Sequence, residues 1–144
     1  MQDSGHLTRC RSEGSPLRKG QVIAVGDAAG LLDPWTREGI SFALRSGALA
    51  GDYAAKAATA GDPTTTERAL DGYAAAINAA LVPDMRAGRV LMSAFTRHPG
   101  TFHKGMSTAK GWGAFVKFCR SERSFAELVN YPAARLALSL ISRL

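Results

Sequence analysis

The sequence predicts a mainly α-helical protein in which one buried strand is followed by four or five helices. Two observations lead to this fold class. A short apolar run at residues 22–25 ends at Gly26-Asp27 and is followed by a glycine-rich loop. Apolar residues at helical spacing begin near Gly39 and recur along most of the remaining chain. Helices should therefore make up the greater part of the molecule.

The first element is expected after a lead-in at residues 1–20, which is rich in Ser, Gly and charge and has no sustained period. Residues 21–25 form a continuous apolar run after Gln21, which is typical of a strand buried on both faces of a parallel sheet. Residues 39–60 are Ala-rich and predict a helix that stops at Gly61-Asp62-Pro63. Within it, Gly47 and Gly51 suggest that another segment packs closely against the helix.

A second long helix is predicted from a capping box at Thr64 and Glu67 to about Arg97, with an interruption at Pro83. Residues 101–113 are expected to form a loop, in which residues 107–110 could begin a turn of helix. Residues 112–119 form a strongly apolar, aromatic helical patch flanked by lysines and arginines. This patch fits an acidic membrane surface or a buried helix face with its cations extending outward.

Two shorter helices are predicted at the C-terminal end. Ser124 and Glu127 form a capping box that opens a helix through Asn130. Pro132 then opens a helix over residues 133–144, which has little polar face. That helix is too short to span a bilayer, so we expect it to pack on this domain, on a domain outside this sequence, or on a membrane interface.

Composition limits the partners and the compartment. The net charge of +6 favours anionic partners, and the basic residues are dispersed without a recognisable nucleic-acid module, so no nucleic acid is expected. Cys10 and Cys119 lack metal spacing and are interpreted as reduced thiols. His98 and His103 have no third ligand nearby, so no metal site is predicted. Without a signal sequence or an apolar run of about 18 residues, the protein is expected to be cytoplasmic, with peripheral membrane contact as an alternative.

The strand, loop and helix order also predicts half of a ligand site. A carboxylate at the C-terminal end of a strand points into the crevice where α/β folds bind ligands. A helix N-terminus offers free N–H groups and the positive end of its dipole. Asp27 would supply the carboxylate, and Gly39 and Ile40 would supply the N–H groups.

The residues GDAAGLLDP, followed by REGISFALRSG, carry a family resemblance. They resemble the second FAD-binding motif of the geranylgeranyl reductase family, a branch of the p-hydroxybenzoate-hydroxylase-like flavoproteins. The resemblance covers roughly thirty residues of this chain. Arg37 stands where many members have a glycine.

The resemblance implies that the chain is the C-terminal part of an α/β FAD-binding fold. Residues 1–20 would be a flexible lead-in, residues 21–62 a partial FAD-binding strand, loop and helix, and residues 63–144 a C-terminal helical region. Asp27 would accept a hydrogen bond from a ribityl hydroxyl, and the Gly39 and Ile40 amides would stabilise charge on N1 and the C2 oxygen of reduced flavin. The implied cofactor-binding residues are Gly26, Asp27, Ala28, Pro34, Gly39 and Ile40.

The family also implies an activity, the reduction of isoprenoid C=C bonds by hydride transfer from reduced flavin. The substrate would be an isoprenoid or another apolar small molecule, and the electron donor a nicotinamide cofactor or a ferredoxin-like protein. No G-x-G-x-x-G fingerprint is present, so we expect this chain by itself to bind FAD weakly or not at all and to be inactive. No catalytic residue is assigned. The alternatives are a flavin-dependent monooxygenase or halogenase with the same motif, or a non-enzymatic basic helical module that binds a partner or an acidic membrane.

Overall fold

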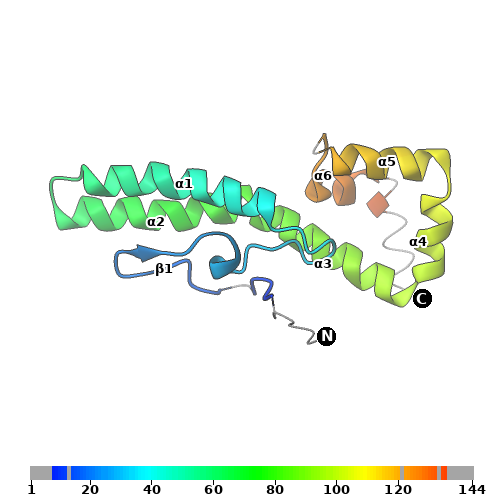
Figure 1. The fold of residues 1–144 in the computed structure, drawn as a ribbon, viewed down its shortest axis with the longest axis horizontal. Helices are drawn as coiled ribbons and strands as arrows, with labels where there is room; N and C mark the ends of the chain where they lie inside the picture. Colours follow the sequence, from blue (N-terminus) through cyan, green and yellow to red (C-terminus); the bar gives the residue numbers. More distant parts are fainter. Residues whose placement is uncertain (1–7, 13, 121, 133, 136–144) are drawn as a thin grey trace, which may run out of the picture. The chain divides into compact units, whose positions relative to one another are not determined.

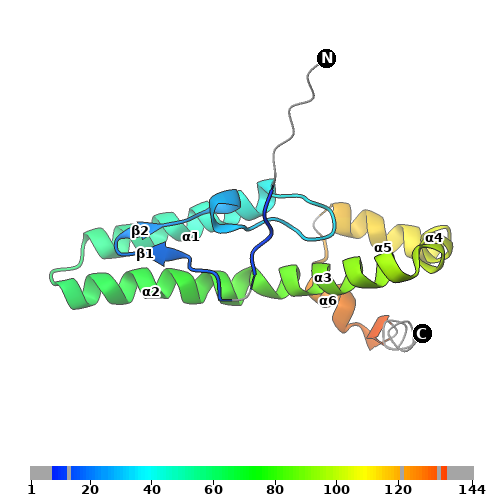
Figure 2. The same ribbon diagram turned by 90° about the horizontal axis from the view of Figure 1, so that it is seen from below.

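The computed structural model describes residues 8–12, 14–120, 122–132 and 134–135. The chain divides into two compact units, Met1–Val82 and Pro83–Leu144, which are described separately. Figures 1 and 2 show that helices dominate the described residues, and strands contribute only two short elements. The mainly α prediction is therefore confirmed.

The first unit begins with a small β-hairpin. Strands β1 (Arg18–Lys19) and β2 (Val22–Ile23) pair antiparallel, with Arg18 opposite Ile23. The expected strand at residues 21–25, buried on both faces of a parallel sheet, is therefore wrong for this structure, since the Val22 side chain is 73% exposed. An apolar run identifies a strand but leaves its partner undetermined, and here the partner is the preceding segment of the same chain.

Two long helices form the body of this unit. Helix α1 (Ile40–Ala58) closely matches the predicted helix, and it packs side by side with α2 (Pro63–Ala80) in both ribbon views (Figures 1 and 2). A Cβ placed on Gly72 of α2 would lie 2.6 Å from Cε1 of Tyr53, so this glycine makes room for the α1 ring. Among the described residues, nothing lies within 4 Å of a Cβ placed on Gly47 or Gly51, so the close packing expected at these glycines is not made here.

The core of this unit draws on the hairpin, the loop and both helices. Leu17 belongs to it, although it falls within the expected lead-in at residues 1–20, and β1 follows it directly. Its buried apolar side chains include Leu17, Ala29, Leu31, Leu32, Phe42, Ala50, Leu70, Tyr73, Ile77 and Leu81. Because α2 packs on α1, the sequence-based boundary between residues 62 and 63 falls inside one compact unit.

The N-terminus of α2 differs from the predicted capping box. Asp62 is the N-cap: its Oδ1 accepts the Thr65 N–H at 3.0 Å, and its Oδ2 accepts the Thr65 hydroxyl at 2.6 Å. Pro63 occupies the first helical turn, where its missing N–H costs nothing. Thr64 is therefore not the cap, because the Asp-Pro pair begins the helix instead of ending the preceding one. The Thr65 hydroxyl and N–H bonds lower the pKa of Asp62.

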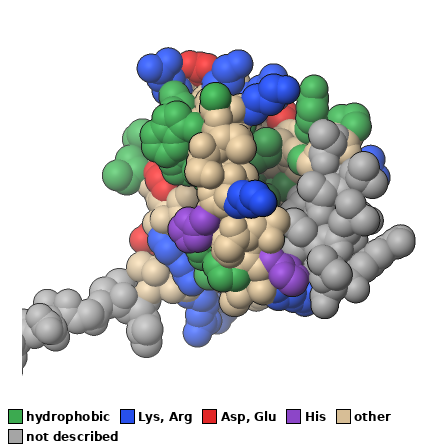
Figure 3. All heavy atoms as spheres, turned by 90° about the vertical axis from the view of Figure 1, so that its right-hand side faces the viewer, with side chains coloured by type: hydrophobic (Ala, Val, Ile, Leu, Met, Phe, Trp, Pro, Cys, Tyr) green, Lys and Arg blue, Asp and Glu red, His purple; other side chains and the backbone are tan. Residues whose placement is uncertain are grey.

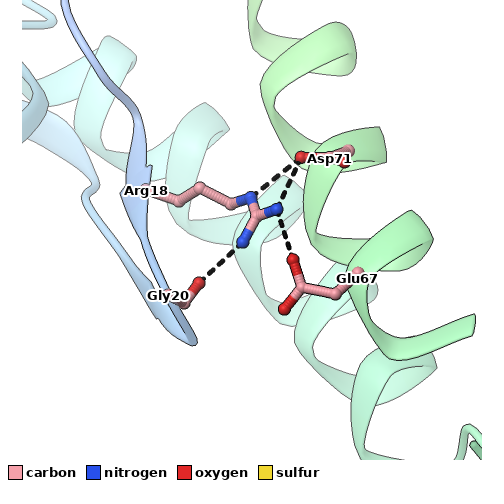
Figure 4. A network of polar contacts seen from close by, with 4 residues as sticks. All are labelled: Arg18, Gly20, Glu67 and Asp71. Atoms are coloured by element: carbon pink, nitrogen blue, oxygen red, sulfur yellow. Dashed lines mark hydrogen bonds and ion pairs between the residues drawn. The ribbon is translucent and has the colours of Figure 1, made fainter. Parts of the chain in front are cut away.

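Figure 4 shows how the hairpin is attached to α2. The Arg18 guanidinium of β1 donates to Glu67 at 2.6 Å and to Asp71 at 2.9 Å, and also to the Gly20 carbonyl at 2.8 Å. Glu67 and Asp71 lie one helical turn apart, so a single guanidinium spans both carboxylates. The two acceptors raise the pKa of Arg18. Glu67, predicted to complete a capping box, instead holds the hairpin.

The second unit contains α3 (Val82–Arg97), most of which lies in it, and then α4 (Pro99–Met106), α5 (Ala109–Cys119) and α6 (Phe125–Asn130). The predicted interruption at Pro83 is confirmed, since α2 and α3 are separate helices and Pro83 lies in the first turn of α3. The loop predicted for residues 101–113 is wrong. Pro99 occupies the first turn of α4, and the Thr108 hydroxyl caps α5 by accepting the Gly111 N–H at 3.1 Å.

Helix α6 begins as predicted. The Ser124 hydroxyl accepts the Glu127 N–H, and Glu127 accepts the Ser124 N–H, which completes the capping box. Asp84 of α3 also accepts the Ala126 N–H at 3.1 Å, adding negative charge at this helix N-terminus. Phe125 is buried and stacks on Phe118 of α5, with ring centroids 3.8 Å apart. The helix predicted at residues 133–144 lies largely outside the described residues.

Candidate functional site

The loop between β2 and α1 is anchored on α1 by Gly26. Its backbone adopts φ +50°, and a Cβ placed there would lie 3.0 Å from the Ala43 Cβ, so the chain approaches the helix as closely as a glycine allows. The Gly26 N–H donates to the buried Ser46 hydroxyl at 3.0 Å, and that hydroxyl donates to the Ala43 carbonyl at 3.1 Å. Ser46 thereby fixes the start of the loop against the second turn of α1.

Asp27 follows directly and lies against the N-terminus of α1. A Cβ placed on Gly39, the N-cap of α1, would stand 2.9 Å from Asp27 Oδ1 and 2.8 Å from Leu32 Cδ1. Asp27 is exposed, and no donor within the described part of the chain pairs with its carboxylate. Two residues twelve positions apart are thus brought together, with an open carboxylate beside a helix N-terminus.

The α1 N-terminus keeps some of its donors open. Glu38, which precedes the N-cap, binds this terminus, because its two carboxylate oxygens accept the Ser41 N–H and the Ser41 hydroxyl, each at 2.7 Å. Over the described residues, the N–H groups of Gly39 and Ile40 have no acceptor. The Ile40 side chain is 76% exposed. These open N–H groups are the kind that bind negative charge at a helix N-terminus.

The segment from Asp33 to Glu38 is a closed turn. Asp33 Oδ1 accepts the N–H groups of Trp35 and Thr36 and the Thr36 hydroxyl, at 2.6–2.9 Å. The Asp33 N–H donates to the Glu38 carbonyl and the Arg37 N–H to the Asp33 carbonyl, at 2.9 and 3.0 Å. Asp33 is only 2% exposed, so its carboxylate is buried within the turn. It organises the turn, as Asp residues do when they bond to backbone two or three residues on.

Arg37 has the left-handed backbone conformation, with φ +62°, and no other non-glycine residue described here does so. This region is crowded for a side chain with a Cβ and is adopted most easily by glycine. The Arg37 guanidinium donates to the Cys10 sulfur at 3.1 Å. This hydrogen bond links the turn to the segment that precedes β1.

That preceding segment covers the other side of the loop. The Arg11 N–H donates to the Gly30 carbonyl at 2.6 Å, and the Arg11 guanidinium donates to the Ser15 carbonyl. Gly30 adopts φ +67°, and its missing Cβ would lie 2.9 Å from the Arg11 nitrogen. Burial lowers the pKa of Arg11, an effect that the nearby Tyr73 partly offsets.

Tyr73 of α2 binds the backbone at the end of the hairpin. Its side chain is fully buried, and its hydroxyl donates to the Ala24 carbonyl at 2.6 Å. Burial raises the pKa of Tyr73, and the positive charge of Arg11 acts in the opposite direction. Ala24 lies two residues before Gly26, so this bond fixes the end of the hairpin that leads into the site.

The structure brings most of the predicted residues into one region. Gly26, Asp27 and Gly39 are juxtaposed, and Ile40 begins the adjoining helix. Ala28 lies in η1 (Gly26–Ala29) and is exposed, whereas Pro34 is buried within the turn.

Sequence reasoning missed three residues that hold this region in place. Ser46 and Arg11 left no local signal, because their partners are distant in sequence. Asp33 did leave one, since an Asp followed three positions later by Thr is a recognisable turn pattern.

Within the described residues, no group of three His, Cys, Asp or Glu side chains is placed to hold a metal ion. His103 instead packs edge-on against the Phe95 ring. Cys10 is a free thiol, and the Cys119 side chain is outside the description.

None of the described helices combines the length and apolarity needed to cross a membrane.

Comparisons of the chain with protein-family models, with curated protein sequences and with solved structures gave no match.

Proposed function

We propose that this chain is the C-terminal part of an FAD-dependent oxidoreductase that resembles the geranylgeranyl reductases. In this proposal residues 21–62 belong to an α/β FAD-binding fold. The enzyme reduces C=C bonds of an isoprenoid or another apolar small molecule. Its electrons come from a nicotinamide cofactor or a ferredoxin-like protein.

The observation that carries the proposal is the juxtaposition of Asp27 and Gly39. An exposed carboxylate without a partner among the described residues lies against a helix N-terminus whose first N–H groups are open. A carboxylate accepts hydrogen bonds from sugar-like hydroxyls, and a helix N-terminus stabilises negative charge. A ribityl chain next to a ring that becomes anionic on reduction needs both groups side by side.

Arg37 gives a second, independent support. Many members of the resembled family have a glycine at this position, and the backbone here has the left-handed conformation that glycine adopts most easily. A turn of the same shape is therefore expected with either residue. The arginine is accommodated at a cost in backbone strain, and its guanidinium contacts Cys10.

Each residue has a stated task in this proposal. Asp27 accepts a hydrogen bond from a ribityl hydroxyl, and the Gly39 and Ile40 N–H groups face the N1 and C2-oxygen edge of the ring. Gly26 and Ala28 shape the loop, and Pro34 fixes the turn beside the ring. Bound flavin would supply the hydride chemistry, so no side chain of this chain is assigned a catalytic role.

Backbone NMR of the full 144-residue chain, titrated with FMN, tests the proposal. FMN carries the ribityl chain and the ring without the adenosine half. We expect amide shifts concentrated at Asp27, Gly39 and Ile40, and a dissociation constant raised about tenfold or more in Asp27→Ala, since a charge-assisted hydrogen bond is lost. Asp52→Ala, which removes an exposed carboxylate elsewhere on α1, is the matched control.

Two results would contradict the proposal. One is a titration in which FMN shifts amides elsewhere in the chain and none between residues 26 and 40. The other is equal binding by Asp27→Ala and the parent chain. An independent test is the coding sequence upstream, which should encode a strand followed by G-x-G-x-x-G in the same frame, because the pyrophosphate needs that loop.

A further inference from the structure

The large apolar side chains that the first unit exposes gather in one region. Among its described residues they are Val22, Val25, Ile40 and Leu44, with exposed fractions from 38% to 76%. The strand and helix members of this set adjoin, because Val25 precedes Gly26, and a Cβ placed on Gly26 would lie 3.0 Å from the Cβ of Ala43 on α1. The four side chains therefore belong to one exposed apolar area.

One face of α1 is exposed and apolar along the length of the helix. Its residues recur at intervals of three or four, which places them on the same side of a helix. They are all exposed and together are called the α1 face: Ile40, Ala43, Leu44, Gly47, Ala48, Gly51, Ala54, Ala55 and Ala58. The charged residues of α1 occupy another side, where Arg45 donates to the Ala80 carbonyl of α2 at 3.0 Å. An exposed helix face normally carries polar residues, so this pattern indicates a contact surface.

Gly47 and Gly51 lie in the middle of the α1 face. Among the described residues, nothing lies within 4 Å of a Cβ placed on either glycine. A glycine in a helix interior costs about 1 kcal/mol relative to alanine. Small residues at a helix crossing let two helix axes come closer together. The two glycines are therefore suited to the approach of another helix.

The outer edge of β2 is open. The Ala24 N–H donates to the Leu17 carbonyl at 2.9 Å, and the next pair in the ladder is Arg18 with Ile23. Bonded and non-bonded pairs alternate in an antiparallel ladder, so the Ile23 N–H and C=O are directed away from β1. Over the described residues neither group has a partner. Residues 21–25 also contain none of the charges or prolines that protect open edges.

The open edge and the α1 face lie on the same side of the first unit. Arg18 joins β1 to α2, and η1, which follows β2, packs on α1. In Figure 2, β2 accordingly lies on the α1 side of the hairpin. A strand that paired with β2 would therefore bring its own covering helix next to α1.

The exposed apolar side chains of the second unit have charged neighbours instead. Trp112 of α5 is 57% exposed. Figure 3 shows Lys, Arg and His side chains next to hydrophobic ones on the face that includes α4 and α5. That face therefore differs from the uncharged α1 face.

We propose that β2 and the α1 face form an interface between two copies of this chain. Strand β2 pairs antiparallel with β2 of the second copy, and the Ile23 N–H and C=O of each copy bond to those of the other. A twofold axis brings the same surface of both copies together. The two helices are antiparallel and cross at Gly51. Leu44 and Ala58 are each seven positions from Gly51, so a large side chain meets a small one across the interface.

The chemistry of the surface favours a second copy over other occupants. An open strand edge needs N–H and C=O partners in register, which a lipid does not supply. The α1 face has no charge that would attract a nucleic acid. Residues 1–82 contain eight Lys and Arg against nine Asp and Glu, so two such units do not repel each other strongly. The interface does not depend on the proposed flavin site.

The size of the surface sets the expected affinity. Helix α1 has 19 residues, and half of the surface of a helix of this length is about 500 Å². Two copies would bury roughly 1,000 Å², which is at the lower limit of specific interfaces. We expect a reversible dimer with a dissociation constant on the order of 10 μM.

Analytical ultracentrifugation of the full chain from about 1 to 300 μM tests the proposal, and we expect a shift from monomer to dimer. Gly51→Lys should raise the dissociation constant at least tenfold, since it places two like charges at the crossing. Gly61→Lys makes the same substitution at an exposed glycine between α1 and α2 and should leave the constant within about twofold of the parent. Both sites have open space for a side chain, and circular dichroism checks that the helices remain.

Amide hydrogen exchange tests the strand pairing separately. Exchange at Ile23 should slow at least about fivefold as the dimer forms, because its N–H becomes bonded. The Ala24 N–H is already bonded within the hairpin and should change little. Three results would overturn the proposal: a monomer up to the highest concentration, equal dissociation constants for Gly51→Lys and Gly61→Lys, or a dimer in which Ile23 exchanges as fast as in the monomer.

Discussion

Gly39 lies so close to Asp27 that a methyl group on its Cα would stand 2.9 Å from the Asp27 carboxylate oxygen. This relationship defines the candidate site, because it places an open carboxylate directly at the N-terminus of α1. It also makes the site sensitive to the smallest possible substitution.

Gly39→Ala should destabilise the protein by about 1–3 kcal/mol, because the added carbon would also lie 2.8 Å from the buried Leu32 side chain. Gly47→Ala is the matched control on the same helix. It meets no atom within 4 Å, so it should stabilise by about 0.5–1 kcal/mol through helix propensity. Urea unfolding of both variants measures the difference. Equal effects in the same direction would show that Asp27 and Leu32 do not approach Gly39 in solution.

Arg37→Gly should be more stable than Arg37→Ala by about 1 kcal/mol, since glycine relieves the left-handed backbone strain and alanine does not. Both substitutions remove the guanidinium contact with Cys10 equally, so their difference isolates the backbone term. Chemical denaturation of the two variants provides the comparison. An alanine variant as stable as the glycine variant would contradict the positive φ at this position.

Tyr73→Phe should cost about 1–2 kcal/mol, because the Ala24 carbonyl loses its hydrogen bond from the buried hydroxyl. The pH dependence is a second measurement. Burial raises the pKa of Tyr73, so its contribution is complete below the unfolded-state pKa of about 10 and declines as pH rises above it. The parent chain should lose stability above about pH 10 more steeply than Tyr73→Phe does. Parallel losses in the two proteins would indicate that this tyrosine is not buried.

Asp62→Ala should lower the melting temperature at pH 7, since the first turn of α2 loses its cap. The pKa of Asp62 is lowered from 3.8 by the Thr65 hydroxyl and N–H, so its contribution is present above that value and is lost as pH falls through the folded-state pKa. The difference between parent and variant should therefore shrink in acid, as thermal unfolding across pH 2–7 would record. Thr64→Ala should have a smaller effect at pH 7. A larger effect of Thr64→Ala than of Asp62→Ala would indicate that Thr64 is the cap.

Sequence determined the features of this protein that depend on neighbours along the chain. The bounds of α1, the break at Pro83 and the capping box at Ser124 and Glu127 follow from propensity, a missing donor and a three-residue spacing. The order of strand, loop and helix also predicts Asp27 near the N-terminus of α1, where Gly39 lies beside its carboxylate.

Tertiary structure decided what depends on distant partners. The apolar run pairs with the preceding strand, and Glu67 accepts a hydrogen bond from Arg18. Asp33 is buried, and the Ser46 hydroxyl accepts the Gly26 N–H. The physical reason is the range of each interaction: a cap or a proline acts within one turn, whereas a strand partner or a buried hydrogen bond is chosen only when remote segments meet.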